Sequence, residues 1–366
     1  MVRSRRFEGL RRERVEASPR FVDGGFRNTH GISGPEIEGS RAALIREFVF
    51  EGKRRIPTAP LPAIDPRPGW ARPADTGLRA TWLGHSTVVV EQDGARILTD
   101  PVWGLRASPS QLFGPKRFQP IPVAIDALGP IDLVVVSHDH YDHLDHTTIE
   151  RMRDWDTTFW VPLGVGAHLE RWGIAESRIV ELDWWDEGHS GPLRIVCTPA
   201  RHASGRGVLD RNATLWAGWA VLGANNRIFF SGDTGLFDGM RDIGRRLGPF
   251  DLTMVEVGAY HALWPDWHSG PEQAVLAHTW LRGDVFMPIH WGLFDLALHG
   301  WTEPAERARV AADSRGIAIV IPQPGESFEP AKVQKTLPWW PRNIPWETAR
   351  QAPIISNATN GRPAKN

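Results

Sequence analysis

The feature that most constrains this chain is a cluster of histidine and aspartate residues directly after a short apolar run. The run covers residues 133–136, and the sequence continues Ser-His-Asp-His-Tyr-Asp-His-Leu-Asp over residues 137–145. A short apolar run bounded by polar residues is typical of a buried strand. Several imidazoles and carboxylates on one turn form a donor set suited to Zn²⁺ or a similar divalent ion. The segment therefore predicts a metal site at the end of a strand.

The spacing within the cluster indicates two ions rather than one. In an extended segment, residues i and i+2 point to the same side. His138 and His140 are therefore expected to share one ion, while Asp142 and His143 face a second. A chance cluster of surface histidines is the alternative, and the number of donors at this spacing disfavours it.

Three further candidate ligands, His202, Asp233 and His290, each follow an apolar strand-like run. A lone histidine at a strand end is as often a hydrogen-bonded structural residue. Three such positions beside an existing cluster favour metal ligands. Asp233 can bridge two cations, because each carboxylate oxygen can bind a different ion, and we expect a bridging hydroxide to complete the site.

The order of the predicted elements indicates an α/β fold. Short β-type runs recur from residue 79 to residue 321. Helical patterns lie among the later runs, at residues 147–153, 164–172, 239–247, 271–281 and 303–315. Apolar strands that end in Asp or His, with helices between them, predict packed sheets covered by helices on the outside.

The two ends of the chain differ from the centre. Residues 1–20 hold seven Arg and three Glu without apolar periodicity, which predicts a mobile basic arm. Six prolines lie between Pro57 and Pro73, which predicts an extended strap rather than a helix. We therefore divide the chain into an arm and strap at 1–74, a main domain at 75–330 and a Pro-rich tail at 331–366.

Composition excludes several classes of partner and location. Lys and Arg total 42 against 43 Asp and Glu, so no global field attracts nucleic acid. The single cysteine, Cys197, cannot form an internal disulfide, and no signal-like apolar run opens the chain, so we expect a cytoplasmic protein. No stretch of the sequence has the ~20 consecutive apolar residues needed to span a bilayer. Any contact with lipid is therefore expected to be peripheral. The sequence leaves a homodimer open.

Several longer motifs carry a resemblance. The metal cluster and the later His, Asp and His resemble the metallo-β-lactamase fold. Within that superfamily the chain resembles the N-acylphosphatidylethanolamine-hydrolysing phospholipase D branch, through Thr-Trp-Leu-Gly-His-Ser-Thr at 81–87, Leu-Thr-Asp-Pro at 98–101, Gly-Pro-Lys-Arg-Phe at 114–118, Glu-Leu-Asp-Trp-Trp at 181–185, Gly-Asp-Thr-Gly at 232–235 and Ile-His-Trp-Gly at 289–292.

The resemblance implies an αββα sandwich of two packed mixed sheets with helices on the outer faces. It also implies two Zn²⁺ ions, although another divalent transition metal would suit the same donors. The implied ligands are His138, His140 and His202 for one ion, Asp142, His143 and His290 for the other, and Asp233 between them.

Other residues are predicted to assist. His85 and Asp100 lie at strand ends, where each would hydrogen-bond to a ligand side chain. The resemblance implies that His268 contacts the scissile phosphate or the leaving group, and the alternative is a structural histidine before a helix. Catalysis is assigned to Asp142, Asp233 and His268, and substrate contact to Lys116, Arg117, Tyr141 and Tyr260.

These features predict a binuclear zinc phosphodiesterase of phospholipase D type, acting on a lipid-like substrate. The 18 tryptophans predict that some large rings line an apolar groove. The first alternative is a lactonase or a small phosphoester hydrolase on the same fold. A redox di-iron protein and a catalytically silent binding scaffold are disfavoured, because no flavin motif is present and all seven ligand positions are filled.

Overall fold

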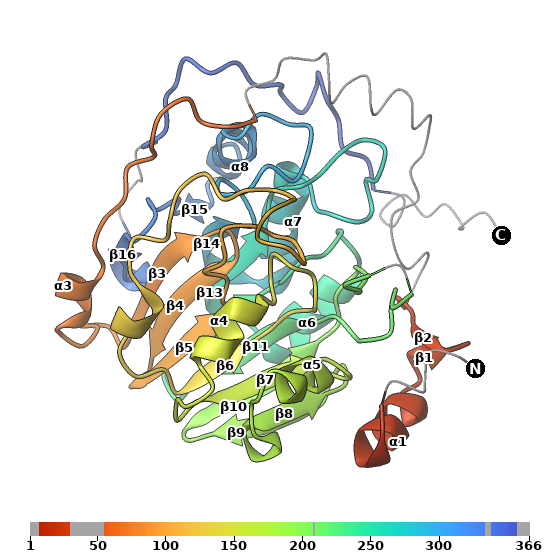
Figure 1. The fold of residues 1–366 in the computed structure, drawn as a ribbon. Coiled ribbons are helices and arrows are strands. Elements are labelled where there is room, and N and C mark those ends of the chain that lie inside the picture. Colours follow the sequence, from red (N-terminus) through yellow and green to blue (C-terminus); the bar gives the residue numbers. More distant parts are fainter. Residues whose placement is uncertain (1–6, 30–54, 208, 334–337, 357–366) are drawn as a thin grey trace.

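Two seven-stranded mixed sheets form the centre of the molecule (Figure 1). The computed structural model describes residues 7–29, 55–207, 209–333 and 338–356. The first sheet has the strand order β16 (Ser327–Phe328), β3 (Leu78–Gly84), β4 (Thr87–Gln92), β5 (Ala95–Thr99), β6 (Leu133–Val135), β7 (Thr158–Pro162) and β8 (Ile179–Leu182). The second has the order β15 (Ala318–Ile319), β14 (Gly283–Ile289), β13 (Phe250–Glu256), β12 (Arg227–Phe230), β11 (Gly218–Leu222), β10 (Leu193–Thr198) and β9 (Glu187–Ser190).

Each sheet has an antiparallel half and a parallel half. β5 to β8 pair in parallel in the first sheet, and β12 to β15 do so in the second. Parallel strands deliver the residues that follow them to one edge of the sheet. Asp100 and Ser137 follow β5 and β6, while Asp233 and His290 follow β12 and β14. The topology therefore gathers the predicted ligands at one end of the sandwich.

Alternating side chains supply the two cores that hold the layers together. Val88 and Val90 of β4 belong to the core between the sheets, whereas Val89 between them faces the outer core. Trp219 also crosses the layers, because its Nε1–H donates to the Val136 carbonyl at 2.9 Å.

Helices cover the outer faces, as Figure 1 shows. The first sheet carries α4 (His146–Arg151) and α5 (Gly166–Arg171), whose Ile149 and Leu169 lie in the outer core. The second sheet carries α6 (Gly239–Leu247), α7 (Pro271–Leu281) and α8 (Glu303–Asp313). The predicted αββα sandwich is confirmed.

Residues 7–29 contain a helix and a hairpin, in contrast to the predicted mobile arm. Residues Gly9–Ala17 form α1, and the short hairpin of β1 (Phe21–Val22) and β2 (Gly25–Phe26) follows. Arg11 forms ion pairs with Glu170 and Glu181, both at 2.5 Å, and Val15 is fully buried. One apolar contact and a partly buried ion-pair network hold this helix, which apolar periodicity alone does not detect. Residues 1–6 of the predicted arm lie outside the described residues.

The two Pro-rich segments lie along the sandwich. The strap contains one helical turn, α3 (Arg67–Trp70), because Pro68 falls in the first turn, where a missing N–H costs nothing. Near the other end, Trp339 and Trp340 pack against Trp291. Short 3₁₀ turns complete the fold at Ile125–Ala127, Glu176–Arg178 and Pro330–Lys332. Within the described ranges, no helix has the length and apolar character needed to cross a bilayer.

Candidate metal centre

Four side chains form a first group of donors at the ligand edge. They are His138, His140, His202 and Asp233. His140 Nδ1 lies 2.7 Å from His138 Nε2 and 3.3 Å from His202 Nε2. Asp233 Oδ2 lies 3.9 Å from His138 Nε2 and 3.7 Å from His202 Nε2. Loops after β6, β10 and β12 thus converge on one point.

A second group shares Asp233 with the first. Its Oδ2 lies 3.1 Å from His143 Nε2 and 3.0 Å from His290 Nε2. Asp142 Oδ2 lies 3.3 Å and 3.4 Å from the same two nitrogens. Asp233 therefore stands between two sets of imidazoles, the position that a bridging carboxylate occupies.

The spacing of these donors fits tetrahedral ligation. With zinc bonds of about 2.0–2.2 Å, two ligands of one tetrahedral ion lie about 3.3–3.6 Å apart. Most of the separations above lie near that range. His143 Nε2, His290 Nε2 and Asp233 Oδ1 are also buried without a hydrogen-bond partner among the described residues. The two nitrogens lie 3.1 and 3.0 Å from Asp233 Oδ2, and buried polar atoms without a partner are the atoms that divalent cations would satisfy.

A hydrogen-bond chain from Asp100 orients two of the imidazoles. Asp100 Oδ2 accepts from His143 Nδ1–H at 2.7 Å and from the Ser137 hydroxyl at 2.6 Å. The Ser137 oxygen in turn lies 2.9 Å from His138 Nδ1 and accepts its proton. Both histidines thereby keep Nε2 unprotonated toward the cluster, as metal ligation requires.

Glu256 orients a histidine on the opposite side of the cluster. It ends β13, is fully buried, and its Oε2 accepts from His268 Nδ1–H at 2.9 Å. Its Oε1 accepts from the backbone N–H groups of Thr234 and Ser269 at 2.7 and 3.0 Å. One carboxylate thus joins the Asp233 loop to the His268 loop.

Opposite charges favour the ionised forms of Asp233 and His290. Burial alone would raise the pKa of the Asp233 carboxyl, but His143 and His290 outweigh it and hold that pKa well below its usual range. Burial likewise disfavours charge on His290, yet Asp233 and Asp142 raise its pKa to about 10. The carboxylates therefore attract positive charge to the imidazoles between them, and a divalent cation supplies more of it than a proton does.

Comparison with known proteins agrees with this geometry. The family described as Beta-lactamase superfamily domain matches residues 95–291. The N-acyl-phosphatidylethanolamine-hydrolyzing phospholipase D 1 of Caenorhabditis elegans is 39% identical over 255 residues, which cover 66% of this chain and 72% of that protein. The chain belongs to the metallo-β-lactamase-fold hydrolases. The predicted resemblance to the phospholipase D branch is confirmed with it.

Two further comparisons extend over most of the hydrolase. An uncharacterized protein of Mycobacterium tuberculosis is 45% identical over 330 residues, which cover 89% of this chain and 88% of that protein. The solved structure of a metallo hydrolase from the archaeon Ignicoccus hospitalis is 25% identical with a TM-score of 0.52, covering 69% of this chain and 98% of that chain. The chain is thus a metal-dependent hydrolase by family.

The residues predicted to support the ligands lie against them. Asp100 contacts His143, as described above, and His85 Nε2 lies 3.0 Å from Asp142 Oδ2. His85 takes a positive φ of 54°, an uncommon conformation for a non-glycine residue. Its carbonyl also accepts the His290 backbone N–H at 3.0 Å. His268 lies in the same cluster, stacked on His290 with ring centroids 5.2 Å apart.

The two basic residues predicted to bind substrate, Lys116 and Arg117, differ in their exposure to solvent. Lys116 is exposed on the loop at 104–118. Arg117 is buried, and its guanidinium donates to the carbonyls of Val102 and Gly104 while it lies over the Phe294 ring. Burial lowers the pKa of Arg117 to about 10. Arg117 therefore holds the loop to the sandwich rather than reaching outward.

The two tyrosines also have partners within the protein. The Tyr141 hydroxyl donates to the Arg206 carbonyl at 2.6 Å, while its ring lies beneath the Arg206 guanidinium. The Tyr260 hydroxyl donates to Glu303 at 2.7 Å in a buried network with Arg307. Burial and Glu303 raise the pKa of Tyr260 well above its usual range. The structure therefore does not bring Tyr260 to the ligand atoms, because its hydroxyl serves the packing of α8.

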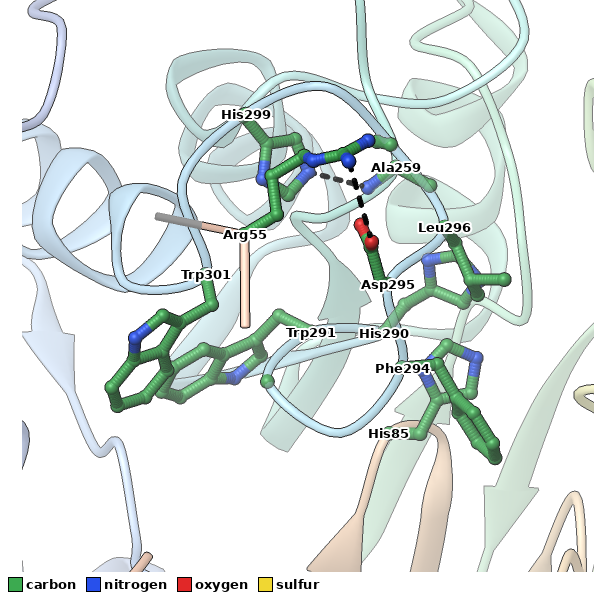
Figure 2. A pocket seen from close by; sticks show the side chains of 12 residues that line it. Arg55, His85, Ala259, His290, Trp291, Phe294, Asp295, Leu296, His299 and Trp301 are labelled. Carbon is green, nitrogen blue, oxygen red and sulfur yellow. Dashed lines mark hydrogen bonds and ion pairs between the residues drawn. The ribbon is translucent and has the colours of Figure 1, made fainter. Parts of the chain in front are cut away.

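A small pocket adjoins the second group of donors. Figure 2 shows His85 and His290 on its wall, together with Trp291, Phe294 and Trp301. The polar side of the pocket carries Arg55 and Asp295, whose charged groups lie 3.9 Å apart. The metal centre thus borders an aromatic space as well as solvent.

Sequence reasoning missed Glu256 as a functional residue. The signal was present, because Glu256 ends an apolar run just as Asp233 and His290 follow theirs. Its distance in sequence from the histidine cluster concealed the connection, which only the parallel pairing of β12, β13 and β14 makes.

Replacing Glu256 with Gln tests its role. We expect Glu256→Gln to fold and keep its metal content but to hydrolyse substrate about 10–100-fold more slowly. The amide cannot accept from His268 Nδ1–H and from both backbone N–H groups as a carboxylate does. The measurement is turnover together with elemental analysis and thermal unfolding, with the exposed Glu176→Gln as the matched control. Unchanged turnover in Glu256→Gln would contradict the assignment.

Proposed function

We propose that this hydrolase cleaves a phosphodiester that carries an apolar portion, as a binuclear zinc enzyme of phospholipase D type. The observation that carries the proposal is Asp233, whose Oδ2 lies 3.0–3.1 Å from His143 and His290 and 3.7–3.9 Å from His202 and His138. Two ions on a common carboxylate can hold the oxygens of a phosphodiester between them. The 39% identity to a phospholipase D of Caenorhabditis elegans supports a lipid-like substrate.

The residues fit the roles that such a reaction needs. Bound zinc would supply Lewis-acid charge and lower the pKa of a coordinated water. His138, His140 and His202 would hold one ion, and Asp142, His143 and His290 the other. The oxygen of water bonds to phosphorus as the P–O bond to the alcohol breaks, and the alcohol oxygen leaves with a proton.

His268 is the candidate donor of that proton. Its Nδ1–H is committed to Glu256 at 2.9 Å, so its second nitrogen is the one that can exchange protons with substrate. The ring lies beside His202 and His290, with centroids 5.1 and 5.2 Å away. A leaving oxygen at the metal centre is therefore within reach of this side of the ring.

The open side of the cluster favours a substrate with an apolar part. His140, Asp142 and Trp267 are each half-buried, so the ligand edge reaches solvent there. Trp267 stacks on His202 at 5.5 Å and Trp264 lies three residues before it, also half-buried. Large rings beside a charged centre suit a molecule with a phosphate head and an apolar chain.

A neighbouring loop supports contact with a lipid surface. Leu112 and Phe113 are 77% and 73% exposed at its tip. Arg106 closes the loop by donating to the carbonyls of Gln111 and Gly114. At its base, the Gly104 N–H donates to Asp145, which lies in the metal-binding segment. Apolar residues at the tip, with Arg106 and the exposed Lys116 behind them, suit a surface that contains anionic lipid.

The metal content tests the binuclear site. We expect about two zinc ions per chain, and we expect Asp233→Asn to lose at least one of them together with most of its activity, since an amide is a neutral and poorer bridge. Elemental analysis after dialysis and thermal unfolding give the result. A folded Asp233→Asn protein with two ions and normal turnover would exclude a bridging role.

The substrate is tested by comparing four compounds at matched concentrations. They are N-acylphosphatidylethanolamine, phosphatidylethanolamine, a short-chain analogue and bis-p-nitrophenyl phosphate. We expect faster cleavage of the long-chain lipids, because the rings beside the ligand edge would bind the apolar chain. Cleavage of only the water-soluble diesters would leave a small phosphoester hydrolase. If none of the four compounds is cleaved, turnover of a lactone in a separate assay would favour a lactonase.

Binding to vesicles tests the loop. We expect Leu112→Ser combined with Phe113→Ser to reduce the bound fraction several-fold on vesicles of phosphatidylcholine and phosphatidylglycerol. The reason is the loss of two apolar side chains that would enter the interface. Co-sedimentation is the measurement, and Leu10→Ser, an equally exposed leucine on α1, is the control. Equal binding by all three proteins would argue against this loop.

A further inference from the structure

The backbone of one candidate ligand, His202, is held by a residue from the start of the chain. Asn28 Oδ1 accepts from the His202 N–H at 3.1 Å, and Asn28 Nδ2 donates to the His202 carbonyl at 3.0 Å. The side-chain amide of Asn28 thus pairs with both polar groups of one residue, as a neighbouring strand would. These two residues lie 174 positions apart in the sequence.

Asn28 is itself fixed from two directions. Its Oδ1 also accepts from Trp216 Nε1–H at 3.0 Å, and Trp216 is almost fully buried. Phe26, two residues earlier, is buried and donates its N–H to the Asn212 carbonyl at 2.7 Å. The segment before Asn28 is therefore docked, so the amide meets His202 in a fixed orientation.

The imidazole of His202 is fixed from the opposite side. Its Nδ1–H donates to the Trp267 carbonyl at 3.2 Å, which directs Nε2 to the first donor group. Asp266, the residue before Trp267, forms an ion pair with Arg201 at 2.9 Å. Ser356, near the other end of the chain, donates its hydroxyl to Asp266 at 2.7 Å and is also buried. Asn28 and Ser356, which lie before and after the two seven-stranded sheets in the sequence, thus both reach the residues around His202.

We propose that Asn28 is a positioning residue for the first metal site, acting through the backbone of His202, and that Ser356 supports the same ligand through Asp266. This inference rests on the ligand role of His202 in the proposed function, and it does not depend on the substrate. The family match covers residues 95–291, so Asn28 and Ser356 both lie outside it. The segments that contain Asn28 and Ser356 then support the metal site, in addition to packing against the two sheets.

The physical reason is the short reach of a metal bond. A nitrogen ligand must lie about 2.0–2.1 Å from zinc, and small shifts of its backbone move it out of range. His202 sits in a loop after β10, where no strand partner holds it. The Asn28 amide supplies the two hydrogen bonds that a strand partner would otherwise provide. Loss of such supporting contacts typically weakens metal binding about 10–100-fold.

Zinc titration of Asn28→Leu tests the proposal. Leu keeps the size of the side chain but removes both hydrogen bonds. We expect one of the two ions to bind about 10–100-fold more weakly, with the other unchanged. Competition with a chromogenic chelator gives the affinities, and the visible spectrum of the cobalt-loaded protein reports altered geometry at one site. Ser356→Ala is expected to shift the same ion by a smaller factor.

The matched control is Asn226→Leu. The Asn226 side chain donates to Asp93 at 2.7 Å, in the turn between β11 and β12, at the opposite end of those strands from Asp233. We expect both zinc affinities to be unchanged in this variant. If Asn28→Leu fails to fold, Asn28→Ser, which retains a small polar side chain, replaces it in the same titration.

The outcomes separate this proposal from the proposed function. Wild-type affinity for both ions in a folded Asn28 variant overturns the positioning role, and so does equal weakening in Asn226→Leu. If the unsubstituted chain binds two zinc ions but cleaves no phosphodiester, while Asn28→Leu loses affinity for one ion, the positioning role stands and only the proposed reaction fails.

Discussion

The arrangement of this hydrolase depends on one buried carboxylate, Asp233, placed between two sets of imidazoles. A charged group with almost no solvent contact must be compensated by opposite charge. His143 and His290 lie within 3.1 Å of its Oδ2, and the histidines of the other group lie at 3.7 Å and beyond. Since these residues come from four different loops, the strands beneath must end at matching heights. β6, β12 and β14 belong to the parallel halves of the sheets, and β10 runs in the same direction as β12 because both pair antiparallel with β11.

Three kinds of anchor then convert a cluster of side chains into a preorganised site. Asp100 holds His143 and, through Ser137, His138. Glu256 holds His268, and a backbone carbonyl holds His202. In each case one ring nitrogen is engaged and the other is directed to the centre. The energy needed to order the rings is therefore supplied by folding, before any ion binds.

The part of the site that could be predicted is the part encoded locally. Histidine and aspartate residues after apolar runs indicated the ligand edge, and the apolar runs indicated the strands. The sequence does not reveal which individual polar side chains are buried. Arg117 and Tyr260 were therefore assigned to substrate, although their polar groups bind the protein itself. The α1 helix was missed because Arg11 docks it through Glu170 and Glu181, which are far away in sequence.

Contacts between residues far apart in the sequence also add support to the metal site that the shared fold does not supply. The common sandwich supplies the strand ends that bring His138, Asp233 and His290 to the site. His202 also lies beyond the end of its strand, β10, and hydrogen-bond partners from elsewhere hold it. Asn28 and the Trp267 carbonyl provide them from two separate segments. A segment that looks like a dispensable extension in the sequence can therefore affect metal binding by a ligand that lies within the part of the chain that matches the family.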